Sequence, residues 1–343
     1  MNATERILNA IEKLWPLDLW QDQTIVLGVS GGADSMALMC AIRQLQPVSE
    51  RCIVAHFNHA VRGHESDEDE SFVREQARRL DLVCMCARAS DEEIAKPSEH
   101  SLRRVRHKFF LDVAMRQGAH WIALAHHADD QVETLLNNLL RGSGPSGLAG
   151  IPTTRNIEAS VVLMRPLLQV TRCQILEYLG EIGQPYRTDR SNESNQYTRN
   201  RIRNELLPFL RSFVGSDKLD RRLGQACELI GEEHRVIETL ARHWLARSGY
   251  EEWRSEEEGE SGFSLPLSSC ISECWPVVRQ ALVFLWHQRQ WPMREMDYEH
   301  WRRVERLLLA AAGSTHPKRT ELPSGIVVMC RKGTVSISRR NFE

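Results

Sequence analysis

The chain has 343 residues, of which 42% are hydrophobic and 26% are charged, and its net charge is −2. This length and composition predict a globular protein with about two domains, each large enough for its own core. Because the net charge is near zero, a nucleic-acid partner cannot be inferred from overall charge and would have to bind a local basic patch.

The sequence lacks membrane and signal segments and paired CxxC cysteines, which bears on the location of the protein and on the redox state of its thiols. No stretch approaches the ~20 consecutive apolar residues that a membrane helix needs, and residues 1–15 contain acidic positions and no signal-peptide core. We therefore expect a cytoplasmic protein with no membrane partner. The nine cysteines lie mostly in apolar runs and include no CxxC pair, which favours buried, reduced thiols.

The first half of the chain alternates between apolar runs and amphipathic patterns. Strands are predicted at residues 24–30, 51–57, 82–87 and 120–126, and helices at residues 36–44, 67–80, 101–117 and 129–140. Near-continuous apolar strands separated by helices predict a parallel sheet with helices on both faces. Ligands of such sheets bind at the carboxyl ends of the strands.

The second half of the chain does not continue the alternation of strands and helices. Apolar residues at three- and four-residue steps predict a long helix over 218–247. Residues 251–260 hold six glutamates, which favours a solvated loop. A helical unit over 276–312 and two strands, 320–330 and 334–338, joined by a hairpin turn, complete the chain. We expect a catalytic domain over 1–215 and a smaller, mainly helical substrate domain with a terminal β-hairpin over 216–343.

A glycine-containing loop follows the first predicted strand and precedes the first sheet-covering helix. Its residues are Ser30, Gly31, Gly32, Ala33, Asp34 and Ser35. Glycines allow close backbone approach, and the helix N-terminus and serine hydroxyls supply donors, so the loop predicts a pyrophosphate cradle. It lacks the Walker lysine and the third glycine of a dinucleotide fingerprint. A carboxylate in an anion cradle needs a bridging cation, so Asp34 predicts Mg²⁺; a helix-capping Asp34 is the alternative.

Histidines and arginines mark the next two segments. His56 and Arg62 follow the second strand, where polar residues favour a functional role. Arg103 and Arg106 lie three residues apart and share a helix face. Two cations on one face fit contact with a triphosphate or with RNA phosphates, although a solvated basic face would have the same pattern.

The fourth strand ends in His-His-Ala-Asp-Asp-Gln-Val-Glu. His126 and Asp130, four residues apart across the strand–helix corner, are predicted to face one site, with Glu133 one turn further on. The pattern fits a metal site of histidine and carboxylates and equally fits acid–base handling of a substrate.

Two further segments have an amino-acid composition that is typical of segments that contact a substrate. The glycine-rich stretch 141–150 fits an active-site lid or substrate channel. Arg199, Arg201 and Arg203 occur within five residues, and a helix would place Arg199 and Arg203 on one face. Such a patch can bind RNA phosphates or complete a nucleotide site.

These motifs occur in one order: SGGADS, HxxH with Arg-Gly, Arg-x-x-Arg, HHxDDQxET, the glycine-rich loop, RPLL, DxSN and TRNxIR. In that order, over about residues 20–210, the sequence resembles the tRNA(Ile)-lysidine synthetases of the PP-loop ATP-pyrophosphatase class. The resemblance is weaker over 275–311 and the closing hairpin. The extra C-terminal domain of longer family members is expected to be absent.

The resemblance implies an α/β fold with a Rossmann-like parallel sheet. It implies that ATP, with Mg²⁺, adenylates the wobble cytosine of tRNA(Ile) with a CAU anticodon and that L-lysine then displaces AMP; it is compatible with a homodimer. The implied catalytic residues are Asp34, His126, Asp130, Arg106 and Arg199. Besides the loop, ATP would contact His56 and Arg106, and tRNA would contact Arg62, Arg103, Arg199, Arg201 and Arg203.

Three other functions fit parts of the pattern. A tRNA thiolase of this fold would need a thiol carrier or an Fe–S centre, and the missing CxxC pair argues against it. An amidotransferase-type synthetase would bring a glutaminase domain, which is not seen in the sequence. A non-catalytic RNA-binding protein would not need the phosphate loop. Residues 301–343 contain nine Lys or Arg and three Glu, which predicts an RNA-binding element there.

Overall fold

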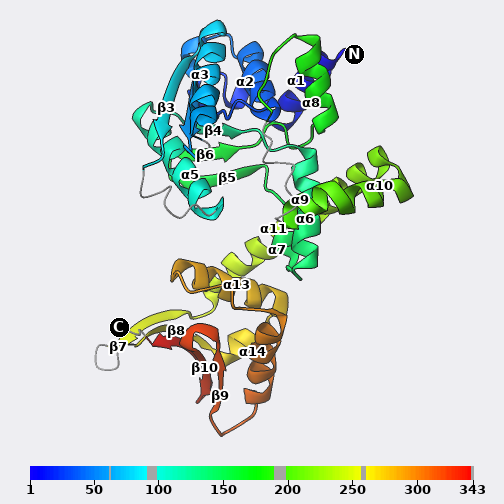
Figure 1. Cartoon of the computed structure of the whole chain (residues 1–343). Coiled ribbons are helices and arrows are strands. Elements are labelled where there is room, and N and C mark those ends of the chain that lie inside the picture. The colour runs from blue at the N-terminus through cyan, green and yellow to red at the C-terminus, as the bar shows by residue number, and fades with distance from the viewer. Residues whose placement is uncertain (62, 91–98, 189–197, 256–259, 341–343) are drawn as a thin grey trace. The chain divides into compact units, whose positions relative to one another are not determined.

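The computed structural model describes the chain except for residues 62, 91–98, 189–197, 256–259 and 341–343. It divides into two compact units, Met1–Ile230 and Gly231–Glu343 (Figure 1). The division falls inside a 32-residue helix, α11 (Ser216–Arg247). The boundary expected at 215 coincides with the start of that helix.

The first unit contains the predicted parallel sheet. Its strands are β1 (Ile25–Gly28), β2 (Cys52–Asn58), β3 (Val83–Arg88), β4 (Trp121–Leu124), β5 (Thr154–Glu158) and β6 (Val161–Met164). Within the described residues their order is β3-β2-β1-β4-β6-β5, and every pair is parallel except β5–β6. The four predicted strands are confirmed. The β5–β6 hairpin was not predicted, because β5 is polar and largely exposed.

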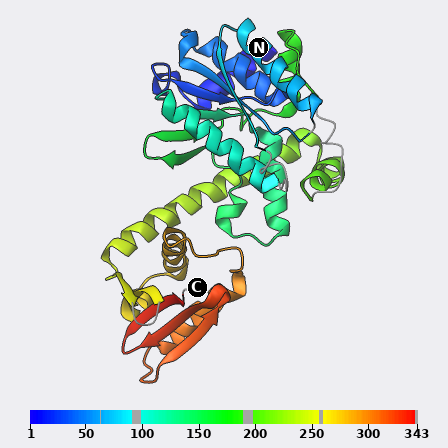
Figure 2. The same ribbon diagram turned by 60° about the vertical axis from the view of Figure 1, so that its left-hand side comes forward.

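Helices cover both faces of this sheet (Figures 1 and 2). They are α1 (Ala3–Leu14), α2 (Ala33–Leu45), α3 (His64–Arg79), α5 (Glu99–Arg116) and α8 (Arg172–Glu181). Apolar residues of α1, α2, α3 and α8 form one core with Leu27 and Ala123. Phe110, Val113 and Ala114 of α5 form a second core with Ile122 and other sheet residues. The sheet therefore separates an α2 face from an α5 face, as its apolar strands predict.

The remaining elements of this unit are short helices and turns, most of which follow β4 or α8 in the chain. They are α6 (Ala128–Leu140), α7 (Pro145–Leu148), α9 (Thr198–Arg201), a π-helical turn (Ile202–Leu206), α10 (Leu207–Val214) and three-residue 3₁₀ turns at Leu17–Leu19 and Ser49–Arg51. Val132 and Leu136 of α6 pack with Ile202, Leu207 and Leu219. This small core fixes the arginine-rich segment and the start of α11 against α6.

The second unit is a sheet packed on helices. Its strands are β7 (Glu251–Ser255), β8 (Glu260–Pro266), β9 (Lys318–Leu322), β10 (Ile326–Arg331) and β11 (Thr334–Arg340), and its helices are α12 (Leu267–Ser272), α13 (Trp275–Gln288) and α14 (Tyr298–Ala311), with a 3₁₀ turn at Pro323–Gly325. The described strands are antiparallel, in the order β7-β8-β11-β10-β9. The predicted terminal hairpin is confirmed as β10–β11, with Lys332 and Gly333 at positive φ in the turn.

The prediction of a solvated loop over 251–260 was wrong at residues 251–255 and 260, and residues 256–259 lie outside the described residues. Residues 251–255 form the edge strand β7, and Glu260 begins β8. Trp253 pairs with Gly262, where a Cβ would lie 2.8 Å from Trp253 Cζ2, so the missing side chain makes room for the indole. Charged side chains are common on edge strands because they oppose further strand pairing. No helix in the described ranges has the length and apolar character needed to cross a membrane.

Candidate active site

The site lies where the strand order of the first sheet reverses. Strand β1 is flanked by β2 on one side and β4 on the other. Parallel sheets leave a crevice at such a switch point, outside the carboxyl ends of the strands. The predicted phosphate loop follows β1, and the two histidines and the acidic residues follow β4, so the topology brings both motifs to one crevice.

The phosphate loop is held by its own serines. Ser30 N–H donates to Ser35 Oγ at 3.1 Å, and Ser35 Oγ donates to the Gly32 carbonyl at 3.0 Å. Gly31 has a φ of +93°, a conformation that glycine adopts without strain. Its carbonyl accepts a hydrogen bond from the Arg187 N–H at 2.9 Å. The loop leads into the 13-residue helix α2, whose N-terminus provides the expected anion-binding end.

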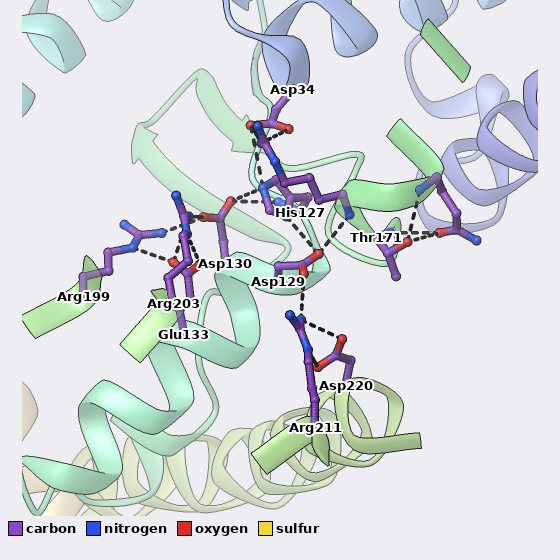
Figure 3. Close-up of polar contacts among 12 residues, drawn as sticks. Asp34, His127, Asp129, Asp130, Glu133, Thr171, Arg199, Arg203, Arg211 and Asp220 are labelled. Atoms are coloured by element: carbon purple, nitrogen blue, oxygen red, sulfur yellow. Dashed lines mark hydrogen bonds and ion pairs between the residues drawn. The ribbon is translucent and has the colours of Figure 1, made fainter. Parts of the chain in front are cut away.

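His127 lies among three carboxylates beside this loop (Figure 3). Its Nε2 is 3.7 Å from Asp34 Oδ2 and 3.5 Å from Asp130 Oδ2, and its Nδ1 is 3.5 Å from Asp129 Oδ2. The side chain is only 2% exposed. His127 also occupies the N-cap of α6, where its N–H donates to Asp130 Oδ2. The imidazole therefore joins α2 to the start of α6.

Two arginines hold the outer side of this cluster. Arg172 Nη1 donates to both oxygens of Asp34 at 2.9 Å, while its backbone N–H donates to Asp129 Oδ2 at 2.9 Å. Arg211 of α10 donates from Nη2 to Asp129 Oδ1 at 2.9 Å and to Asp220 at 2.8 Å. Neither arginine belongs to a motif that was singled out in the sequence.

A second acidic pair binds the arginine-rich segment. Arg199 donates from Nη2 to Asp130 at 2.6 Å and from Nε to Glu133 at 2.9 Å. Arg203 donates to Glu133 through Nε and Nη2, as Figure 3 shows. The Glu133 side chain is 1% exposed. The expected common face of Arg199 and Arg203 is confirmed, and it is directed at α6. Arg201 pairs instead with Glu205 at the surface.

These contacts set the protonation states of the cluster. Burial alone would lower the pKa of His127, but Asp129, Asp130 and Asp34 outweigh it and raise that pKa. Burial would raise the pKa of Asp129, yet His127, the Arg172 N–H and Arg211 lower it. The pKa of Asp130 is likewise lowered, because His127 and Arg199 outweigh its burial. The cluster therefore favours a protonated imidazole among ionised carboxylates.

His126, the histidine chosen from the sequence, lies on the opposite side. Ile122 and Leu124 of β4 belong to the α5-side core, whereas Ala123 and Ala125 pack on the α2 side. The same alternation directs His126 toward α5 and His127 toward α2. Burial and then Arg165 lower the pKa of His126 to about 3. The residue that contacts Asp34 is thus His127, which the sequence reasoning did not select.

The other predicted residues are distributed around the crevice. His56 is 4% exposed, and its Nδ1 hydrogen-bonds the Val29 carbonyl at 2.9 Å; burial lowers its pKa. Arg103 and Arg106 lie on α5, where they lower the pKa of His107 after burial, to about 4. Arg62 lies outside the described residues.

The carboxylates beside the phosphate loop are of the type that Mg²⁺ binds. Asp34, Asp129 and Asp130 offer carboxylate oxygens, which Mg²⁺ prefers, beside a loop that suits phosphates. Among the described residues, no group of three or more His, Cys, Asp or Glu could hold a metal ion alone. Mg²⁺ commonly takes one or two carboxylates together with substrate phosphates and water. The residues therefore fit Mg²⁺ bound jointly with a phosphate-bearing substrate.

Known proteins are similar to this chain over most of its length. The family model of the PP-loop domain matches residues 2–210. The tRNA(Ile)-lysidine synthase of Rhodopirellula baltica is 34% identical over 338 residues, covering 88% of this chain and 84% of that protein. The tRNA(Ile)-lysidine synthase of Bacillus subtilis is 39% identical over 223 residues, covering 64% and 47%. The chain thus spans about half the length of the Bacillus relative.

A solved structure has a fold similar to that of this chain. The U34-tRNA thiolase NcsA of Methanococcus maripaludis, solved with its [4Fe-4S] cluster, superposes with a TM-score of 0.56 at 15% identity, covering 67% of this chain and 79% of that one. At this identity the likeness extends to the fold alone. The family match over 2–210 and the near full-length relative establish that the chain belongs to the tRNA(Ile)-lysidine synthase family of PP-loop proteins.

Proposed function

We propose that this chain is an ATP-dependent ligase that joins L-lysine to C2 of the wobble cytosine in tRNA(Ile) with a CAU anticodon. In the first step the cytosine O2 attacks the α-phosphorus of ATP and pyrophosphate leaves. In the second, the lysine ε-amine attacks C2 and AMP leaves, giving lysidine. The change in base pairing would move codon recognition from AUG to AUA.

The observation that carries this proposal is the convergence of two motifs at one crevice. The loop Ser30–Ser35, held by the hydrogen bonds of its own serines, leads into the N-terminus of α2, whose backbone N–H groups can bind the departing pyrophosphate. Asp34 on that loop and Asp130 after β4 both lie within 3.7 Å of His127 Nε2. Phosphate handling and a carboxylate-rich substrate site are therefore adjacent, as adenylation followed by amine attack requires.

Each charged residue of the site has a separate role in this proposal. Asp130 and Glu133 supply negative charge that can orient the lysine ammonium, and Arg199, which now neutralises both, can move to a phosphate oxygen. Protonated His127 helps to keep Asp130 ionised, because it lowers the pKa of that carboxyl group against the effect of burial. Asp34 would hold Mg²⁺, which supplies charge neutralisation of the phosphates when it is bound.

The test is transfer of labelled lysine to tRNA(Ile) transcribed with a CAU anticodon, with ATP and Mg²⁺. We expect lysine incorporation with one AMP and one pyrophosphate released per lysine. Elongator tRNA(Met), which has the same anticodon, is the matched control and should remain unlabelled. Pyrophosphate release without lysine incorporation, or labelling that does not depend on ATP, would contradict the proposal.

A further inference from the structure

A second group of basic and histidine side chains lies on the α5 side of the sheet and borders the carboxylates around His127, because His126 interacts electrostatically with Asp130. Arg165 follows β6, His126 follows β4, Arg155 lies on β5, and Arg103 and His107 lie on α5. We call these five residues the Arg165 cluster. All of them belong to the first compact unit.

Strand alternation places these residues on one face. Val161 and Leu163 of β6 belong to the α5-side core, so the next residue in the alternation, Arg165, faces α5 as well. Arg155 is paired with Leu163 across the β5–β6 ladder, and paired residues project to the same face.

Helix α5 contributes to the same place. Arg103 and His107 precede the buried Phe110 of α5 by seven and three residues, which puts them on the helix face that packs against the sheet. His126 reaches this face from β4. Two strand ends, an edge strand and one helix therefore supply the cluster.

Arg165 is a buried cation, and no ion pair joins it to a carboxylate among the residues that the structure describes. The residue is 4% exposed. Its Nη1 donates to the Pro152 carbonyl, and its Nε has no hydrogen-bond partner within the described residues. Burial, followed by Arg103 and Arg155, lowers its pKa to about 10. A buried charge that lacks a counterion is costly to the fold.

The two histidines add donors and no negative charge. His107 Nε2 and His126 Nδ1 are buried, and in the part of the chain that the structure describes neither has a hydrogen-bond partner. Burial and the neighbouring arginines lower the pKa of His107 to about 4 and that of His126 to about 3. Both rings are therefore neutral near pH 7, and each can donate one N–H to an anion.

We propose that the Arg165 cluster binds a backbone phosphate of the RNA substrate next to the nucleotide that reacts. The inference rests on the proposed function for its substrate. The cluster borders the site at His126 and continues outward through Arg155 and Arg103, which are exposed. A line of cations from a buried pocket to the surface suits an extended polyanion.

ATP is the weaker candidate for this cluster because of where its own cradle lies. The phosphate loop follows β1 and enters α2 on the opposite face of the sheet. The cluster is built around β4, β6 and β5, which extend away from β1 on that side of the sheet order. In the strand order, β4 therefore lies between β1, which the ATP loop follows, and β6, which Arg165 follows.

The experiment measures binding of fluorescently labelled tRNA(Ile) with a CAU anticodon to the full chain over a salt series. The variants are Arg165→Met and Arg155→Gln. The control is Arg116→Gln, which removes an exposed charge from the other end of α5. We expect Arg165→Met to weaken tRNA binding about ten-fold or more and Arg155→Gln about three-fold, each flattening the slope of log K against log salt by about one. The control should bind as the wild type does.

Stability separates a binding role from a structural one. Removal of an uncompensated buried cation should leave the thermal midpoint of Arg165→Met equal to or above that of the wild type, whereas a structural arginine would lower it. Arg155→Gln, at an exposed position, keeps the test decisive if Arg165→Met does not fold. ATP affinity should be unchanged in both variants.

Three outcomes would overturn the inference. These are unchanged tRNA affinity and salt slope in both variants, a loss of ATP affinity without a change in salt slope, and a lower thermal midpoint of Arg165→Met with normal tRNA binding. Failure of the proposed function is a different result, because it would appear as equal binding of tRNA(Ile) and an unrelated tRNA by the wild-type chain.

Discussion

Arg172 binds both oxygens of Asp34 through a single nitrogen, Nη1, at 2.9 Å each. The arginine side chain is 47% exposed and Asp34 is 29% exposed. Because the pair is open to solvent, its net stabilisation is about 1 kcal/mol or less. The carboxylate that the proposed function assigns to Mg²⁺ is therefore occupied by a cation that can be exchanged at low cost.

Replacing Arg172 should reveal the competition between this arginine and Mg²⁺ for Asp34. In Arg172→Gln, Asp34 loses its competing arginine and keeps only the more distant His127, so half-maximal ATP binding should need about five-fold less Mg²⁺, the factor that corresponds to ~1 kcal/mol. Equilibrium dialysis of ATP against Mg²⁺ concentration measures it. Arg6→Gln is the control, because it breaks an equally exposed pair between α1 and α8. An unchanged Mg²⁺ requirement in Arg172→Gln would contradict the exchange.

Asp34→Ala should abolish ATP-dependent pyrophosphate release while the protein stays folded. The reason is that a carboxylate within an anion cradle is useful only when a cation bridges it to the phosphates. Pyrophosphate release is measured at saturating Mg²⁺, and circular dichroism reports the fold. Near-normal turnover in the folded variant would show that Asp34 has no part in metal binding.

His127 should stabilise the fold most at low pH. Its folded-state pKa is raised above 6.5 by three carboxylates despite burial, so its contribution is fully present below pH 6.5 and is lost as pH rises through the folded-state pKa. His127→Gln should therefore lose most free energy of unfolding, relative to the wild type, on the acid side. Urea titrations at several pH values test this, and a loss that grows with rising pH would reverse the assignment.

The neighbouring His126 should have the opposite pH dependence. Burial lowers its pKa from 6.5 to about 3, so the folded state holds it neutral. Its contribution is present above pH 6.5 and declines as pH falls from 6.5 toward 3. His126→Gln should therefore weaken the decline in the free energy of unfolding over that range. Parallel pH profiles for the two histidine variants would refute the division of the pair between two faces.

Glu133→Gln should detach the arginine-rich segment from α6. The buried carboxylate is the shared partner of Arg199 and Arg203. Removing its charge takes one of two carboxylate partners from each arginine, because Asp130 stays beside both. The expected loss in the free energy of unfolding is about 2–4 kcal/mol, reduced by this remaining partner and by the partial exposure of both arginines. Glu75→Gln is the matched control, since Glu75 also pairs with two arginines but at the surface of α3. Equal effects of the two variants would contradict this role.

Local pattern was enough to predict most of the first sheet and the phosphate loop. The early strands β1, β2 and β4 are short apolar runs that are largely buried on both faces, while the edge strand β3 is partly exposed. A helix follows each strand, so sequence order and burial indicate the same elements. Strands β5 and β7 escaped prediction for one reason. Most of their residues are polar or charged because both strands lie at sheet edges, where only part of each side chain is covered.

The site was predicted less completely than the sheet. Arg172 and Arg211 stand alone in the sequence, and only the packing of α8 and α10 brings them to Asp34 and Asp129. The choice between His126 and His127 required the strand register. Alternate residues of a strand face opposite sides of the sheet. His126 therefore shares a face with Ile122 and Leu124, and His127 faces the other side.

The alternation along β4 also limits how this part of the chain can change length. Removing one residue between Leu124 and His126 would exchange the faces of the two histidines. The imidazole that now lies among carboxylates would be placed among arginines, and Asp34 would lose its neighbour. We expect relatives to vary in the side chains of this segment while keeping its residue count, since even a one-residue insertion here would exchange the electrostatic surroundings of both histidines.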